Sequence, residues 1–121
     1  MLKKTIGNIG EDMASAFLRK KKYGILARNY NTRQGEIDII ARKNDKISFV
    51  EVKSRTSKTF GSAAEAVTWK KRQHIMQAAI IYLQAERPGY KSYGFDVIEV
   101  YLTKEGELEK INHIEDAFTY D

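Results

Sequence analysis

Two short apolar segments joined by four residues constrain the fold of this chain more than any other feature. They cover residues 36–42 and 47–54, and the link between them suits a β-hairpin with Asn44-Asp45 as a two-residue turn. Apolar side chains fall on both faces of this hairpin, with Ile37, Ile39, Val50 and Val52 on one face and Ile40, Ile47 and Phe49 on or near the other. A sheet that is apolar on both faces is covered on both faces.

The rest of the chain supplies that cover. We expect a helix over residues 7–22 that stops near Gly24, strands at 25–30, 36–42 and 47–54, a loop at 55–61, a helix within 62–86, and strands at 95–102 and 108–111. The second helix starts with the capping-box spacing of Ser62 and Glu65, and a break is expected near Thr68-Trp69. The order αβββαββ predicts one α/β domain over residues 1–121, a mixed sheet flanked by helices.

Composition limits the kind of site that the chain can build. There is no cysteine, and the two histidines, His74 and His113, lie far apart, so any metal is held mostly by oxygen, which suits Mg²⁺ or Mn²⁺. The net charge of +5 favours a polyanionic partner such as nucleic acid. We find no signal peptide or membrane-spanning stretch, which predicts a cytoplasmic protein with no membrane partner.

Four charged residues share one face of the predicted hairpin. With the two-residue turn, Asp38 lies opposite Glu51, and Glu36 lies opposite Lys53; a longer turn would shift this register. Two carboxylates so close repel unless a cation lies between them or one is protonated. The carboxylates can hold a divalent ion, while Lys53 positions or deprotonates water or stabilises negative charge on a phosphate. Two carboxylates and a lysine can carry out phosphodiester hydrolysis.

The alternative is that these charges form the solvated face of a half-buried sheet, as charges on hairpins usually do. The apolar residues among them argue against that interpretation, because a sheet covered on both faces would partly bury the charges. Burying charges is costly unless they have a function.

The same residues resemble a known nuclease motif. Asp38 followed by Glu51-Val52-Lys53 is similar to the PD-(D/E)xK motif, with Ile37 in place of its proline. The wider set is Gly7-Asn8-Ile9-Gly10-Glu11, Arg28-Asn29-Tyr30, Gly35-Glu36-Ile37-Asp38-Ile39-Ile40, Phe49-Val50-Glu51-Val52-Lys53-Ser54-Arg55 and Phe95-Asp96-Val97. Together these segments resemble the YraN family of small bacterial proteins, which is predicted to be endonuclease-like and is similar in fold to archaeal Holliday-junction resolvases.

The resemblance implies a restriction-endonuclease-like fold and further site residues. Glu11, Asp38 and Glu51 take the places of the metal-binding and catalytic acids, and Lys53 takes the place of the catalytic lysine. The alternative for Glu11 is a surface acid that stabilises the helix dipole. Glu36 is an additional acid, which either supports the site residues or pairs with Lys53. Similarity to resolvases also suggests a homodimer.

Basic residues elsewhere are candidates for substrate binding. The resemblance favours Lys70, while Arg55 and Lys58 flank or occupy a loop that is equally typical of a plain connection. The Lys70-Lys71-Arg72 run beside Trp69 either contacts nucleic acid or is a solvated helix face with Trp69 in the core, and we expect Trp69 in the core.

Three classes of function fit this sequence. The first is a divalent-metal-dependent nuclease acting on DNA, including branched or otherwise structured DNA. The second is a module that keeps the nuclease fold and binds nucleic acid or a protein without turnover. The third is a structural or assembly role. Salt-dependent DNA binding without cleavage would indicate the second, and absence of both metal and nucleic-acid binding the third.

Overall fold

The computed structural model describes residues 5–56 and 67–119, and its elements follow the expected order αβββαββ. They are α1 (Ile6–Lys20), β1 (Gly24–Asn31), β2 (Glu36–Lys43), β3 (Lys46–Arg55), α2 (Trp69–Glu86), β4 (Ser92–Leu102) and β5 (Leu108–Phe118). The α/β class and the restriction-endonuclease-like mixed sheet are confirmed. Neither helix in the described ranges has the length and apolar character needed to cross a membrane.

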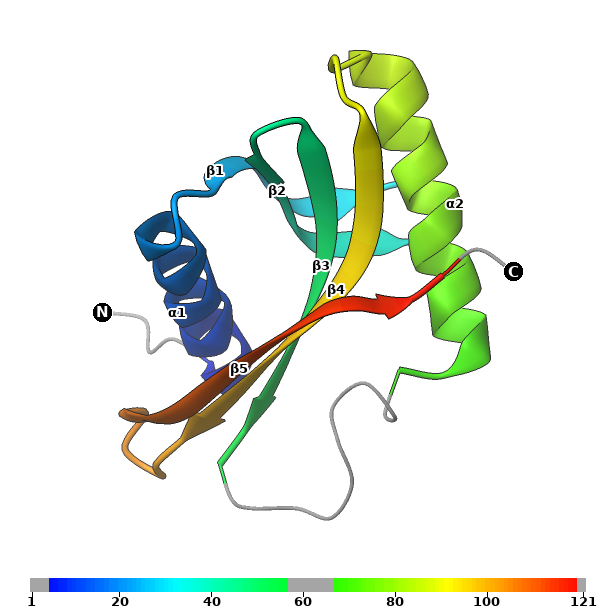
Figure 1. The fold of residues 1–121 in the computed structure, drawn as a ribbon. Helices are drawn as coiled ribbons and strands as arrows, with labels where there is room; N and C mark the ends of the chain where they lie inside the picture. The colour runs from blue at the N-terminus through cyan, green and yellow to red at the C-terminus, as the bar shows by residue number, and fades with distance from the viewer. Residues whose placement is uncertain (1–4, 57–66, 120–121) are drawn as a thin grey trace.

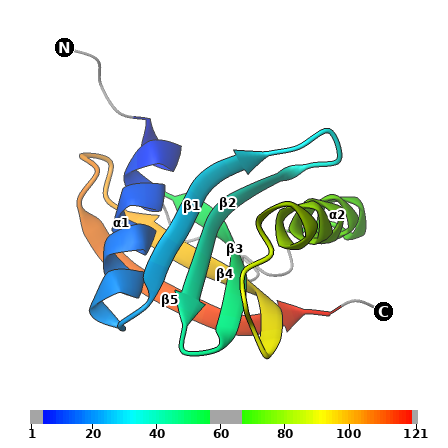
Figure 2. The same cartoon turned by 90° about the horizontal axis from the view of Figure 1, so that it is seen from above.

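The five strands form one sheet in the order β1-β2-β3-β4-β5 (Figure 1). The β3–β4 pair is parallel and the other three pairs are antiparallel. The parallel pair follows from the connection through α2, since parallel neighbours need a crossover. The view from above shows α1 on one side of the sheet and α2 on the other (Figure 2), so the prediction of a sheet covered on both faces is confirmed.

The hairpin between β2 and β3 has the predicted register. Lys43 pairs with Lys46, and the pairs continue to Ile39 with Val50. Asn44 adopts a φ of 55°, a left-handed conformation that asparagine tolerates in tight turns. Beyond Val50 the backbone pairing between β2 and β3 stops, and the Val52 N–H donates to a side-chain oxygen, Asp38 Oδ2, at 2.8 Å. The sheet therefore opens at Asp38, where the charged residues begin.

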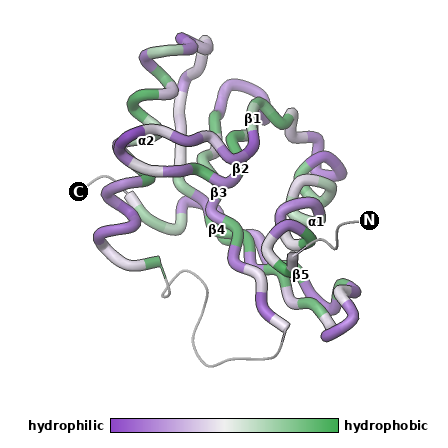
Figure 3. Tube along the Cα trace, turned by 180° about the vertical axis from the view of Figure 1, so that it is seen from behind, coloured by the Kyte–Doolittle hydropathy of each residue, from purple (hydrophilic) through white to green (hydrophobic). Residues whose placement is uncertain are grey.

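Two separate cores fill the spaces between the sheet and the helices. The cluster beneath α1 contains Ala14, Leu18, Ile39, Val50 and Ile98, and the cluster beneath α2 contains Ile40, Ile47, Phe49, Ile75 and Phe95. The trace of α2 carries both hydrophobic and hydrophilic residues (Figure 3), and its buried residues are Ile75, Met76, Ala78, Ala79 and Tyr82.

One core residue lies on the face opposite to the predicted one. Ile37 was expected to share a face with Ile39, but it belongs to the cluster beneath α2, with its β1 partner Tyr30 packed against the same cluster. The simple alternation of faces fails at Asp38, whose carboxylate turns toward the Val52 N–H.

Several element boundaries differ from the sequence-based expectation. The first helix ends at Lys20, and the left-handed residue after it is Lys22 (φ 72°), while Gly24 starts β1 instead of stopping the helix. The second helix begins at Trp69 with Thr68 as its N-cap, as the expected break indicated; the Ser62–Glu65 capping box lies outside the described residues.

The last two strands are longer than predicted. Strand β4 starts at Ser92 rather than residue 95, and β5 runs to Phe118 rather than 111. Polar residues in β5 obscured its strand pattern, and the positive φ of Asp116 (49°) accompanies a register shift opposite Phe95 and Val97.

Gly10 allows α1 to approach β3 closely, which yields a stability prediction. A Cβ on Gly10 would lie 2.9 Å from Ser54 Cβ and closer still to Ser54 Oγ, whereas a Cβ on Gly7 would meet its nearest atom at 3.9 Å. We expect Gly10→Ala to lower the free energy of unfolding by about 2 kcal/mol through overpacking. The matched Gly7→Ala should raise it by about 0.5 kcal/mol, because alanine is the better helix former. Urea denaturation measures both, and equal effects would contradict the close packing.

Candidate active site

A pocket of about 300 Å³ lies between the strands that carry the acids and the first turns of α2. Its lining residues are Gly35, Glu36, Asp38, Glu51, Thr68, Lys70, Lys71, His74 and Ile75. Gly35 sets the spacing, because a Cβ at this position would lie 2.6 Å from the backbone oxygen of His74. Only glycine lets the start of β2 approach α2 this closely, so Glu36 and Asp38 face the helix across the pocket.

Asp38 occupies the point where β2 and β3 separate. Its Oδ2 accepts the Val52 N–H, and the residue is partly buried. Burial and the charge of Glu51 raise the pKa of Asp38 from 3.8 to about 7, with a smaller contribution from Glu11, while the Val52 hydrogen bond and Lys71 oppose the shift. The two carboxylates are therefore close enough to repel, as the predicted register required.

Glu51 is 4% exposed and is approached by two lysines. Lys71 Nζ, from α2, lies 2.6 Å from Glu51 Oε1, and Lys53 Nζ, from the same strand as Glu51, lies 3.7 Å from that oxygen. Burial and the charge of Lys71 lower the pKa of Lys53. Burial by itself also lowers the pKa of Lys71, but the hydrogen bond and charge of Glu51 outweigh it and raise that pKa overall.

Glu11 reaches the site from the other side of the sheet. It lies on α1 with its side chain 16% exposed, and its charge contributes to the raised pKa of Asp38. Burial raises the pKa of Glu11 itself, opposed in part by Arg28, whose Nη2 is 3.8 Å from Glu11 Oε1. Among the described residues that oxygen is buried without a hydrogen-bond partner. Such an atom suits a ligand that the protein itself does not provide.

Of the remaining predicted site residues that the structure describes, Glu36 and Lys70 line the pocket and Arg55 does not. Glu36 is exposed and lines the pocket, and its backbone pairs with Asn31. Within residues 5–56 and 67–119, the carboxylate beside Lys53 is that of Glu51 rather than that of Glu36. Lys70 is exposed and lines the pocket. Arg55 ends β3 and does not line this pocket as far as the described chain goes, while Lys58 lies outside the described residues.

The expectation for Trp69 was wrong. Its side chain is 73% exposed, because Trp69 is the first residue of α2 and precedes the buried face of the helix. The core beneath α2 instead uses residues from Ile75 onward.

The sequence interpretation missed the importance of Lys71. The basic run was visible, but Lys70 was favoured within it, whereas Lys71 is the residue that contacts Glu51. The signal that could have identified it is helical phase. Lys71 stands four residues before Ile75, which is buried in the core facing the sheet, so both residues lie on one side of α2.

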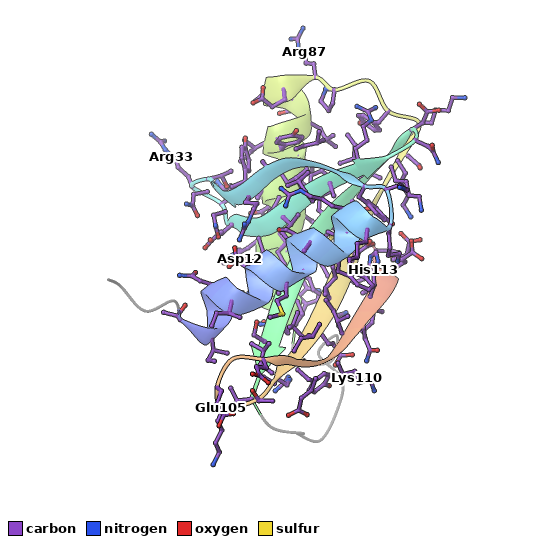
Figure 4. All side chains as sticks on the ribbon, turned by 90° about the vertical axis from the view of Figure 1, so that its left-hand side faces the viewer. Asp12, Arg33, Arg87, Glu105, Lys110 and His113 are labelled. Atoms are coloured by element: carbon purple, nitrogen blue, oxygen red, sulfur yellow. The ribbon has the colours of Figure 1, made fainter. Side chains whose placement is uncertain are left out.

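A second polar cluster lies at the other end of α1. Asp96, His113 and Glu115 offer ligand atoms within 4.8 Å of one another. His113 is on β5, beside the C-terminal end of α1 (Figure 4). Both ring nitrogens are already occupied, since Nε2 lies 2.7 Å from Asp96 Oδ2 and Nδ1 lies 2.9 Å from Lys21 Nζ. The Lys21 ammonium beside His113 Nδ1 therefore completes a hydrogen-bond network that ties the end of α1 to β4 and β5.

Comparison with known proteins shows the family. The sequence model of a family described as "Uncharacterised protein family UPF0102" matches residues 10–100 of this chain. The chain belongs to the UPF0102 family. Among UPF0102 relatives, TTE1452 of Caldanaerobacter subterraneus subsp. tengcongensis is 48% identical over 96% of each chain. The UPF0102 protein of Alkaliphilus oremlandii is 50% identical over 97% of this chain and all of the relative, and that of Syntrophomonas wolfei is 45% identical with the same coverage. The YraN resemblance is thereby confirmed, because UPF0102 is that family.

The raised pKa of Asp38 makes the stability of this UPF0102 protein depend on pH. Suppose that a carboxyl group has a higher pKa in the folded state than in the unfolded state. Its contribution to the free energy of unfolding is then fully present below the pKa of the unfolded state. That contribution disappears as the pH rises toward the folded value. Between about pH 4 and pH 7, metal-free wild type should therefore lose stability relative to Asp38→Asn, which keeps an oxygen for the Val52 N–H. From about pH 4 to about pH 8 the stability difference should change by roughly 4 kcal/mol in favour of the variant.

Chemical denaturation at several pH values measures this difference. Asp45→Asn provides the control, since Asp45 lies in the exposed hairpin turn with its side chain 65% exposed. A stability difference between wild type and Asp38→Asn that stays constant over this pH range would show that burial and the charge of Glu51 do not raise the pKa of Asp38 as described.

Proposed function

We propose that this UPF0102 protein is a divalent-metal-dependent nuclease that hydrolyses phosphodiester bonds in DNA. The observation that supports it most is the convergence of Asp38, Glu51 and Lys71 on one pocket, with Lys53 beside Glu51. Placing two carboxylates together at low exposure costs folding free energy. A cost of this kind is typical of active sites, where perturbed carboxyl groups carry out chemistry.

The donor atoms are of the chemical kind that a hard cation prefers. Asp38, Glu51 and Glu11 offer carboxylate oxygens, and the buried Oε1 of Glu11 has no hydrogen-bond partner within the described ranges. Oxygen donors without sulfur or imidazole suit Mg²⁺ or Mn²⁺. In our proposal these three acids hold the ion, which when bound polarises the phosphate and lowers the pKa of water.

The basic residues in and near the pocket, together with Glu36, have separate roles in this proposal. Lys53, with its lowered pKa, is suited to hold or accept a proton from the attacking water or to stabilise charge on the phosphate. Lys70 and the N-terminus of α2 border the pocket and favour an anionic group there. Arg55 and Lys58 would extend phosphate contacts along the DNA, and Glu36 would support the acids from the pocket edge.

DNA is the proposed substrate for two reasons. The chain carries a net charge of +5, which favours a polyanion. The resemblance to junction resolvases adds branched DNA as a candidate form, and the homodimer that it suggests stays a prediction for sedimentation analysis.

A cleavage assay tests the proposal. The wild-type protein with Mg²⁺ or Mn²⁺ should cleave at least one of linear duplex, single-stranded and four-way junction DNA. Asp38→Asn should lower the rate roughly 100-fold or more, because it removes a charged ligand while keeping the shape of the side chain. Asp45→Asn, an equal charge change at the hairpin turn, should retain the wild-type rate.

Two results would contradict the proposal. One is metal-dependent cleavage that persists in Asp38→Asn. The other is salt-dependent DNA binding without cleavage under either metal, which would indicate a binding module that keeps the nuclease fold.

A further inference from the structure

The cation nearest to the buried carboxylate of the pocket comes from α2. Lys71 Nζ is 2.6 Å from Glu51 Oε1, whereas Nζ of Lys53, the lysine of the strand motif, is 3.7 Å away. Glu51 is 4% exposed, so this contact compensates a charge that water barely reaches. Removing the partner of a buried carboxylate strongly destabilises the folded protein.

The backbone of Lys71 is fixed while its side chain is accessible. Thr68 caps α2, and its Oγ1 accepts the Lys71 N–H at 3.2 Å. The side chain of Lys71 is 45% exposed and lines the pocket beside Lys70 and Thr68. A lysine side chain has several rotatable bonds, so the ammonium can leave Glu51 without any movement of the helix.

One carboxylate oxygen of Glu51 cannot bind both a lysine ammonium and a divalent ion with full strength. Oε1 is the atom that both Lys71 and Lys53 approach, and it belongs to an acid assigned above to metal binding. A divalent ion at Asp38 and Glu51 therefore competes directly with the Lys71 ammonium. Lys70 lines the same pocket, and none of the ion pairs described for this part of the chain joins it to Glu51.

We infer that Lys71 is an internal counter-ion that occupies Glu51 in the metal-free protein and turns into the pocket when Asp38 and Glu51 bind a divalent ion. In the pocket, its ammonium faces the position of the DNA phosphate and neutralises it. Lys71 is thus a positioning residue that keeps the acids folded together before the metal arrives. This inference rests on the proposed function, because it assumes that these acids bind metal.

Calorimetric titration of Mn²⁺ tests the inference without any DNA. Lys71→Met removes the competing ammonium, and we expect Mn²⁺ to bind roughly three- to tenfold more tightly than in wild type. Lys70→Met removes the same charge one residue earlier without removing the Glu51 contact. Its Mn²⁺ affinity should stay within about twofold of wild type, since a solvent-exposed charge is screened.

Thermal unfolding supplies a second readout. Metal-free Lys71→Met should melt at a lower temperature than Lys70→Met, and saturating Mn²⁺ should remove most of that difference. If Lys71→Met does not fold without metal, Lys71→Gln, which keeps a hydrogen-bond donor for Glu51, replaces it with the same expectation of tighter Mn²⁺ binding.

The outcomes separate this inference from the proposed function. Mn²⁺ binding to wild type, with Lys71→Met equal to or weaker than Lys70→Met, would overturn the counter-ion role and leave the nuclease proposal standing. A wild-type protein that binds no Mn²⁺ would remove the basis of both.

Discussion

The repulsion between Asp38 and Glu51 is the constraint on which the local structure depends. The ladder between β2 and β3 ends at Val50, and the Val52 N–H that would continue it is donated to Asp38 instead. Lys53 and Lys71 both approach Glu51, one from the strand and one from α2. The helices on the two faces of the sheet reduce the exposure of these groups, which strengthens every interaction among them. The fold thus holds a charged cluster that requires compensation, and the compensation comes from β3, through the Val52 N–H and Lys53, and from α2, through Lys71.

Much of this arrangement could be predicted from local sequence. The Asn44-Asp45 turn fixes the register of the hairpin, because a two-residue turn leaves little choice of pairing. Once the register is fixed, the approach of Asp38 to Glu51 follows, and so does the partial burial of both, since apolar residues lie on both faces of the same strands. The order of elements and the family were also recognisable, because the motif segments extend over most of the chain.

Features that depend on distant contacts could not be predicted. Ile37 packs beneath α2 because Asp38 interrupts the alternation of faces, which no period-two pattern describes. The choice of Lys71 over Lys70 depends on the rotation of α2 about its axis relative to β3. Trp69 is a different case, because the cause of its exposure is local: Thr68 caps α2 and Trp69 is the first residue of the helix. The full length of β5 depends on its pairing with β4, which brings Asp96 to the Asp116 N–H.

The central claim is that Asp38 and Glu51 together form the cation site of this protein. Crystals grown with Mn²⁺ test it most directly, because anomalous scattering locates the ion independently of any assay. The account predicts an anomalous peak in contact with carboxylate oxygens of both Asp38 and Glu51. A peak at the cluster of Asp96, His113 and Glu115 with none at Asp38, or an ordered Asp38–Glu51 pair without a peak at saturating Mn²⁺, would contradict it.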